Sequence, residues 1–109
     1  MTNATSKTSM ERAAFRAERE DADLRFVLSD PRGRRFLWRE LGRCGLHAQT
    51  YSPNNSEHCF KAGERNAAIR LNLDIIRVSP ELYLTMQAEA VADDAKQKAL
   101  DDQDNEHDD

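Results

Sequence analysis

The segment SDPRGRRFLWRELGRCG, which runs from Ser29 to Gly45, contains five arginines, and four of them recur at helical spacing. On a helical wheel, where each residue advances by about 100°, the four share one narrow arc and form an arginine stripe. The stripe consists of Arg32, Arg35, Arg39 and Arg43. The opposite side carries Leu37, Leu41 and Cys44, with Trp38 at its margin. Such a stripe can neutralise phosphates, bind carboxylates in bidentate fashion, or form a solvated face whose aliphatic stems cover apolar neighbours.

The rest of the sequence helps to rank these uses of the stripe. No recognised nucleic-acid-binding motif is present. The chain ends in an acidic segment, which could itself occupy the stripe and would repel phosphates. A protein partner contacted by the stripe and Trp38 is therefore the leading functional hypothesis. Nucleic-acid binding through the same arginines is the alternative, and a plain solvated face remains open.

Soft metal ligands occur at only four positions, Cys44, His47, His58 and Cys59. Their spacing matches no standard zinc pattern, and adjacent ligands on one helix point in different directions. We expect no metal site and no cofactor. The two cysteines are interpreted as small buried hydrophobic residues.

A catalytic site would show a nucleophile beside a base, a carboxylate pair in a pocket or a glycine-rich phosphate loop. The sequence shows none of these, so we expect a protein that is not an enzyme. Asp74 is the one unusual carboxylate, because it falls near the apolar side of a predicted helix, where an unpaired charge is costly. We expect it to form a structural ion pair with Arg70, or with an arginine of another helix, rather than to act in catalysis.

Composition limits the architecture. The chain has 109 residues, 39% hydrophobic and 33% charged, which suits one domain with a modest core. The net charge of −4 is uneven, because residues 91–109 carry eight acids and two lysines, while residues 1–90 have a balance of +2. The sequence has no run of about 18 apolar residues, so no membrane span is expected. The N-terminus does not resemble a signal peptide. We expect no membrane partner and a reducing cytoplasm, where both cysteines stay thiols.

Helix signals divide the chain into three regions. Residues 1–8 are predicted to be a disordered tail, residues 9–90 a helical domain, and residues 91–109 an acidic tail that is partly helical and then disordered. Within the domain, a first helix from Ser9 is expected to pack by its C-terminal end. The second begins at Pro31 after the capping residues Ser29 and Asp30, and Gly45 ends it. Gly33 and Gly42 inside it suggest close approach by a neighbouring backbone.

Two further helices follow a loop at residues 46–55. Ser56 is predicted to cap a long third helix that is apolar on two faces and therefore lies in the middle of the bundle. One face consists of Phe60, Ala67, Leu71, Ile75 and Val78, and the other of Ile69, Leu73 and Ile76. Ser79 and Pro80 open a fourth helix, with Leu82, Met86 and Tyr83 facing inward. The predicted fold is all-α, a small bundle of about four helices with a long central third helix and disordered termini.

Three motifs in order resemble the Bbp-nineteen-like phage domain family of tailed bacteriophages and prophages. They are DLRFVLSDPRGRRFLWRELGRCG, NSEHCFKAGERNAAIRLNLDI and SPELYLTM, which together span about Asp23 to Met86. The resemblance implies a phage protein in the host bacterial cytoplasm or in the virion, and it implies no established activity. We therefore expect a non-enzymatic minor virion or assembly component that docks on another phage protein. Self-association is also expected to be possible, because a core this small leaves apolar surface exposed.

Overall fold

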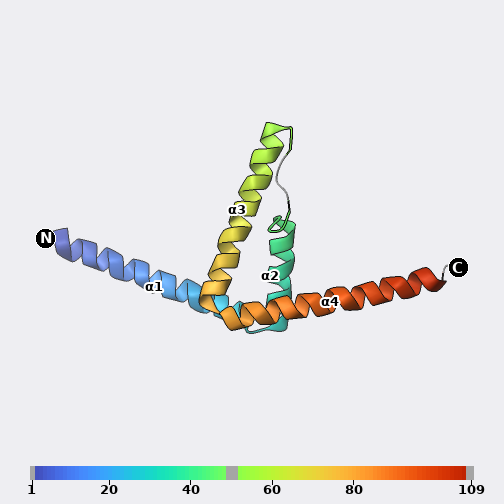
Figure 1. Ribbon diagram of the computed structural model, residues 1–109. Helices are drawn as coiled ribbons and strands as arrows, with labels where there is room; N and C mark the ends of the chain where they lie inside the picture. Colours follow the sequence, from blue (N-terminus) through green and yellow to red (C-terminus); the bar gives the residue numbers. More distant parts are fainter. Residues whose placement is uncertain (1, 49–51, 108–109) are drawn as a thin grey trace.

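The computed structural model describes residues 2–48 and 52–107, and these form four helices with no strand among them. The helices are α1 (Thr2–Leu28), α2 (Pro31–Arg43), α3 (Asn55–Val78) and α4 (Pro80–His107). In Figure 1, α2 and α3 stand side by side, while α1 and α4 leave their base in opposite directions. The all-α prediction is confirmed.

The molecule is extended. Its radius of gyration is 19.9 Å, whereas a compact domain of this length has about 13 Å. The Cα atoms span 80 × 39 × 15 Å. Since two crossing helices together need about 13–15 Å, the thinnest dimension has room for two helices and no third. Much of each helix therefore has no neighbour from the same chain.

Local signals determine the ends of α2. The Asp30 carboxylate accepts a hydrogen bond from the Arg32 backbone N–H at 2.8 Å, and Pro31 occupies the first helical position. At the other end, Gly45 takes the left-handed conformation with φ of 80°. The Gly45 N–H then donates to the Gly42 carbonyl and the Leu46 N–H to the Leu41 carbonyl, both at 3.1 Å. This pair of bonds is a Schellman motif, and its flanking residues Leu41 and Leu46 are both buried.

The start of α3 differs from the prediction. Asn54, and not Ser56, is its N-cap, because the Asn54 side chain accepts from the Glu57 backbone N–H at 3.1 Å. Ser79 caps α4 as predicted, with its hydroxyl accepting from the Leu82 N–H at 3.2 Å. Part of the loop predicted at residues 46–55, residues 49–51, lies outside the described residues.

The core lies where the four helices meet. Its four most deeply buried large side chains come one from each helix, at 2% exposure or less. They are Leu28, Leu41, Ile75 and Met86. Leu82 and Tyr83 pack against this cluster as predicted. Each helix thus contributes to one small shared core, which extends from the base of the molecule up between α2 and α3.

The third helix buries less than its two predicted faces. Ile75 and Val78 of the first predicted face are buried, and so is Ala68, but Phe60 and Leu73 are 69% and 59% exposed. Figure 1 gives the reason for Phe60, since the N-terminal half of α3 rises beyond α2 and away from α1 and α4. Leu73 belongs to the C-terminal half, which is covered on one side only. A central position therefore holds for only the C-terminal half of α3.

The ends of the chain are helical as far as they are described. Residues 2–8, predicted to be disordered, belong to α1, and α4 continues through the acidic segment to His107. The physical reason is that neither proline nor glycine occurs between Met1 and Asp30 or after Pro80. All residues in 8–20 and 91–106 are exposed, so neither arm contributes a buried side chain to the core. Residues 1, 108 and 109 lie outside the described part.

Candidate interaction surface on the second helix

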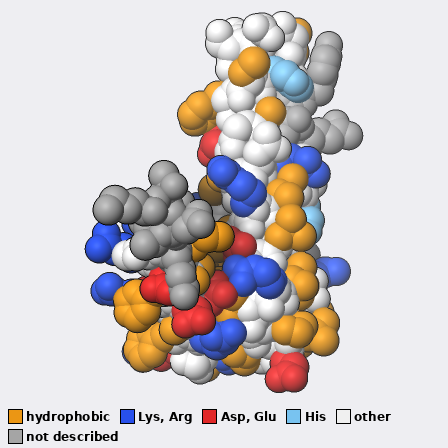
Figure 2. Space-filling model, turned by 90° about the vertical axis from the view of Figure 1, so that its left-hand side faces the viewer, with side chains coloured by type: hydrophobic (Ala, Val, Ile, Leu, Met, Phe, Trp, Pro, Cys, Tyr) orange, Lys and Arg blue, Asp and Glu red, His pale blue; other side chains and the backbone are white. Residues whose placement is uncertain are grey.

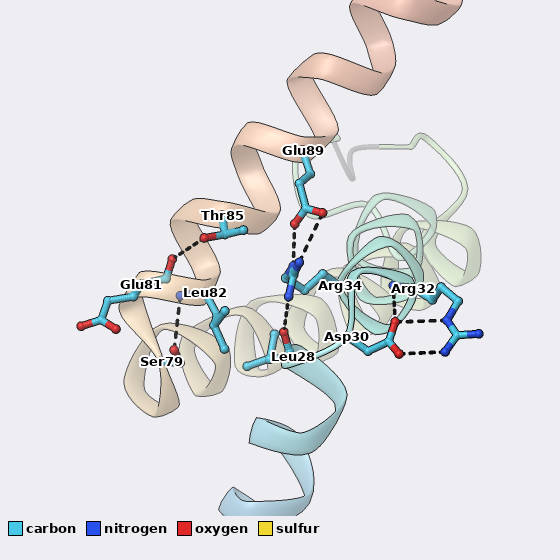
Figure 3. Close-up of polar contacts among 9 residues, drawn as sticks. All are labelled: Leu28, Asp30, Arg32, Arg34, Ser79, Glu81, Leu82, Thr85 and Glu89. Carbon is cyan, nitrogen blue, oxygen red and sulfur yellow. Dashed lines mark hydrogen bonds and ion pairs between the residues drawn. The ribbon is translucent and has the colours of Figure 1, made fainter.

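One arginine of α2 is structural and was missed by the sequence reasoning. The Arg34 side chain is only 10% exposed. Its Nε donates to Glu89 Oε1 at 2.5 Å, and its Nη1 donates to the Leu28 carbonyl at 2.7 Å. Figure 3 shows the guanidinium between the end of α1 and the side of α4. Arg34 therefore joins three helices and is unavailable to a partner.

The spacing did contain a signal for this role. Arg34 precedes Leu37 by three residues and Leu41 by seven, which places it on the buried side of the wheel. The charge of Arg34 favours an exposed position, but its place on the helical wheel predicts a buried one. The fold satisfies both, because Glu89 and the Leu28 carbonyl supply acceptors at the buried position.

Gly33 makes the close approach predicted for it. A Cβ atom built at this position would overlap the Val27 carbonyl oxygen of α1. No atom lies within 4 Å of the corresponding position at Gly42, so the same prediction fails there. Gly33 lets the first turn of α2 pack against the backbone at the end of α1.

The arginine stripe lies on the outer face of α2, and all four side chains are exposed. Arg32 is paired with the N-cap Asp30 at 2.9 Å, and Arg43 with Glu40 at 3.0 Å. The side-chain hydrogen bonds from Arg32 are the main reason that the pKa of Asp30 falls to about 2. The two ends of the stripe therefore have carboxylate partners within the helix or at its cap.

The middle of the stripe is different. Neither Arg35 nor Arg39 forms an ion pair with any carboxylate in residues 8–48 or 52–106. The Arg39 guanidinium lies 5.7 Å from the centre of the Phe36 ring, which is itself half exposed. Two cations and an aromatic ring are thus presented together to solvent.

A groove of about 320 Å³ runs beside this surface, between α2 and α4. Arg35 and Trp38 line the α2 wall, and Met86 lies among the apolar lining residues. Asp93 and Asp94 line the α4 wall. The groove is therefore basic on one side and acidic on the other. Of the predicted contact residues, the fold brings Arg35 and Trp38 to it.

The predicted ion pair of Asp74 exists with a different partner. Asp74 lies 3.4 Å from Arg77, three residues later in α3, and not in an ion pair with Arg70. Arg77 also binds Asp21 of α1 at 2.8 Å and holds the pKa of that carboxyl below its usual value through its hydrogen bond. Asp74 is exposed rather than on the buried face, so a partner was not needed to offset burial. Arg77 is near Asp74 because the two are three residues apart in α3, and near Asp21 because α1 and α3 cross there.

The cysteine and histidine residues form no metal site among the residues that the structure describes. Cys44 is half-buried beside the core, close to the predicted role. Cys59 is exposed near the free N-terminal end of α3, contrary to the prediction of burial. His47 contacts Trp38, with ring centres 6.3 Å apart.

Comparison with known proteins identifies the family. The sequence model of the family described as Bbp19-like phage protein matches residues 24–88, which cover α2, α3 and the first third of α4. The match spans more than half of the chain, so the chain belongs to this family. No curated protein and no solved structure shows significant similarity to it. Among the described helices, none is both long and apolar enough to cross a membrane.

Proposed function

We propose that this Bbp19-like phage protein is a non-enzymatic minor virion or assembly component that docks on another phage protein. The contact surface is the outer face of α2, which carries the arginine stripe and Trp38. The partner it fits is a protein surface with carboxylates for Arg35 and Arg39, basic groups for Asp93 and Asp94, and an apolar side chain that can enter the groove beside Trp38. The observation that carries the proposal is the pair of unmatched cations, Arg35 and Arg39, next to that groove.

Guanidinium groups suit this role because they bind carboxylates through two parallel hydrogen bonds. Arg35 and Arg39 are one helical turn apart, about 6 Å along the axis, and this spacing suits two acidic side chains on a facing element. The helix itself is held firmly, since Arg34 links it to Leu28 of α1 and Glu89 of α4. A rigid presenting helix lowers the entropic cost of binding.

Charge favours a protein partner over a nucleic acid. Asp93 and Asp94 line the groove opposite Arg35, and phosphates placed on the stripe would approach both carboxylates. Arg32 and Arg43 are already paired with acids, so only part of the stripe is available for phosphates. A protein surface can offer both signs of charge, whereas a nucleic-acid backbone offers only one.

Virion incorporation tests the proposal. In the phage or prophage that encodes the chain, the gene is replaced by the Arg35→Glu/Arg39→Glu variant, and purified particles are quantified by mass spectrometry. We expect a fixed copy number for the unmodified chain and a loss of at least about tenfold for the variant, since rim charge pairs contribute modestly but reversal makes them repulsive. The control for the charge change is Lys61→Glu/Arg70→Glu, at two exposed residues of α3, one of which, Lys61, also loses its ion pair with Glu57.

The nucleic-acid alternative is an outcome of the same comparison. If particles lack the unmodified chain, and the purified chain binds a DNA duplex with affinity that falls steeply between about 50 and 200 mM salt, docking on a phage protein is refuted. Normal incorporation of the Arg35→Glu/Arg39→Glu variant would refute the surface assigned to it.

A further inference from the structure

The outer face of α1 is apolar, exposed and unused by the chain itself. It is formed by an outer stripe that consists of Phe15, Arg19, Ala22 and Phe26. Leu24 and Leu28, which pack into the core, lie on the opposite side of the helix. Phe15 and Phe26 are 66% and 79% exposed. Their separation of 11 residues is close to three full turns, so both rings project in the same direction.

Charged residues flank this stripe in a definite order. Arg16 and Asp23 lie on one flank, and Glu18 and Arg25 on the other, as their wheel positions require. All four are exposed, and none forms an ion pair or side-chain hydrogen bond with another described residue. In Figure 2, which is turned so that the N-terminal side of Figure 1 faces the viewer, hydrophobic side chains lie beside acidic and basic ones on the lower part of this face.

We propose that the outer stripe of α1 binds the same stripe of a second copy, with the two helices antiparallel about a two-fold axis. The axis passes between Glu20 and Asp21, midway between the two phenylalanines. Each Phe15 then lies opposite Phe26 of the second copy. In an antiparallel pair related by such an axis, each flank faces the same flank of the other helix.

The flanking charges match under this arrangement. Asp23 faces Arg16 and Arg19 of the second copy, and Glu18 faces Arg25 of the second copy. Each pair occurs twice because of the symmetry, so a dimer contains acid opposite base along both edges of the aromatic contact. This self-complementary order is what singles out a second copy as the occupant.

The available area fits a weak dimer. A phenylalanine can bury about 150–250 Å², and four phenylalanines at these exposures offer on the order of 500 Å². Ala22 and the aliphatic stems of the flanking arginines add to this. The phenylalanine contribution is less than half of the about 1,200 Å² at the lower end of stable interfaces. Association should therefore depend on protein concentration.

Sedimentation velocity over a concentration series tests the contact in the full chain. We expect the unmodified chain to dimerise, and Phe26→Ala to raise the dissociation constant at least about a hundredfold, because each dimer loses two buried rings. Phe60→Ala is the matched control, since Phe60 is 69% exposed on the far half of α3. A chain that stays monomeric up to about 1 mM refutes the proposal, and so does an equal effect of both substitutions.

A charge swap tests the antiparallel register. Glu18→Arg and Arg25→Glu should each weaken the dimer about tenfold, because two attractive pairs become repulsive. The double variant restores both pairs with their signs exchanged, and we expect its dissociation constant to return to within about threefold of the original. Failure of the double variant to recover refutes the register. None of these residues belongs to the arginine stripe, so refuting the dimer would not refute the proposed docking surface, and the reverse also holds.

Discussion

Gly33 gives the sharpest test of how α1 and α2 are joined. In Gly33→Ala the added Cβ atom would overlap the Val27 carbonyl oxygen and would also touch the Val27 Cγ1 at 3.0 Å. The obstructing atom is backbone and cannot turn aside as a flexible side chain would. The end of α1 and the first turn of α2 must therefore separate. This movement also strains the bond from Arg34 to the neighbouring Leu28 carbonyl.

Two opposing contributions set the size of the effect. Overfilling a packed contact costs about 1–3 kcal/mol. Alanine is a better helix former than glycine by up to about 1 kcal/mol, which offsets part of that cost. We expect a net loss of about 1–2 kcal/mol in the free energy of unfolding. For a domain of this size the melting temperature should fall by roughly 4–16 °C.

Urea and thermal unfolding followed by circular dichroism measure this change. Gly42→Ala and Gly63→Ala are matched controls, because both glycines are helical and neither Cβ would meet an atom within 4 Å. Both controls should be neutral or stabilising by up to about 1 kcal/mol. If Gly33→Ala also stabilises the chain, with an unchanged dependence on urea concentration, the close contact between α1 and α2 is wrong.

Three further predictions concern the junction and the core. Glu89→Ala leaves the buried Arg34 guanidinium without its carboxylate, and we expect it to lower the free energy of unfolding in urea by about 1–3 kcal/mol. The double variant Glu89→Ala/Arg34→Met should recover part of this loss. No recovery would mean that the two residues do not act as a pair. The pKa of Asp30 is about 2 against an ordinary 3.8. The stabilisation that its charged form provides is therefore complete above about pH 4 and disappears as the pH falls towards 2. Asp30→Ala should flatten this part of the curve of stability against pH, and an unchanged curve would contradict the prediction. Met86 is 1% exposed and Leu84 is 64% exposed. Met86→Ala should therefore lower the free energy of unfolding by about 2–5 kcal/mol, and Leu84→Ala by no more than about 0.5 kcal/mol. Equal losses of stability in thermal melts would show that Met86 is not part of the core.

The candidate surface was largely predictable from spacing. The four arginines of the stripe are exposed together because a helix fixes the relative directions of its own side chains. Trp38 at the margin of the apolar side became part of a groove for the same reason. The other wall of that groove could not be predicted, because Asp93 and Asp94 are more than fifty residues away along the chain. Which distant side chains meet α2 depends on how α4 crosses it.

Pairing and burial were harder to predict. Asp74 was assigned to Arg70 or to an arginine of another helix, but it pairs with Arg77, three residues later in the same helix. Only the second pair of Arg77, with Asp21 of α1, depends on the crossing of α1 and α3. Arg34 carries the same charge as the stripe residues, and only the approach of Leu28 and Glu89 makes its burial possible. A long-range ion pair depends on positions that no local pattern specifies.

The sequence by itself determined where α2 begins and ends, where α4 begins, and which side of α2 is basic. The residues at these helix ends act on neighbours only a few positions away, so their effects can be predicted from the local sequence. They are Asp30, Pro31, Gly45 and Ser79. The tertiary structure alone decided which apolar stripes are covered. Phe60 and Phe26 look as suited to a core as Ile75 and Leu28, yet two are exposed and two are fully buried. The hydrophobic effect is non-directional and favours the burial of any apolar stripe. The arrangement of the helices therefore determines which stripes are buried.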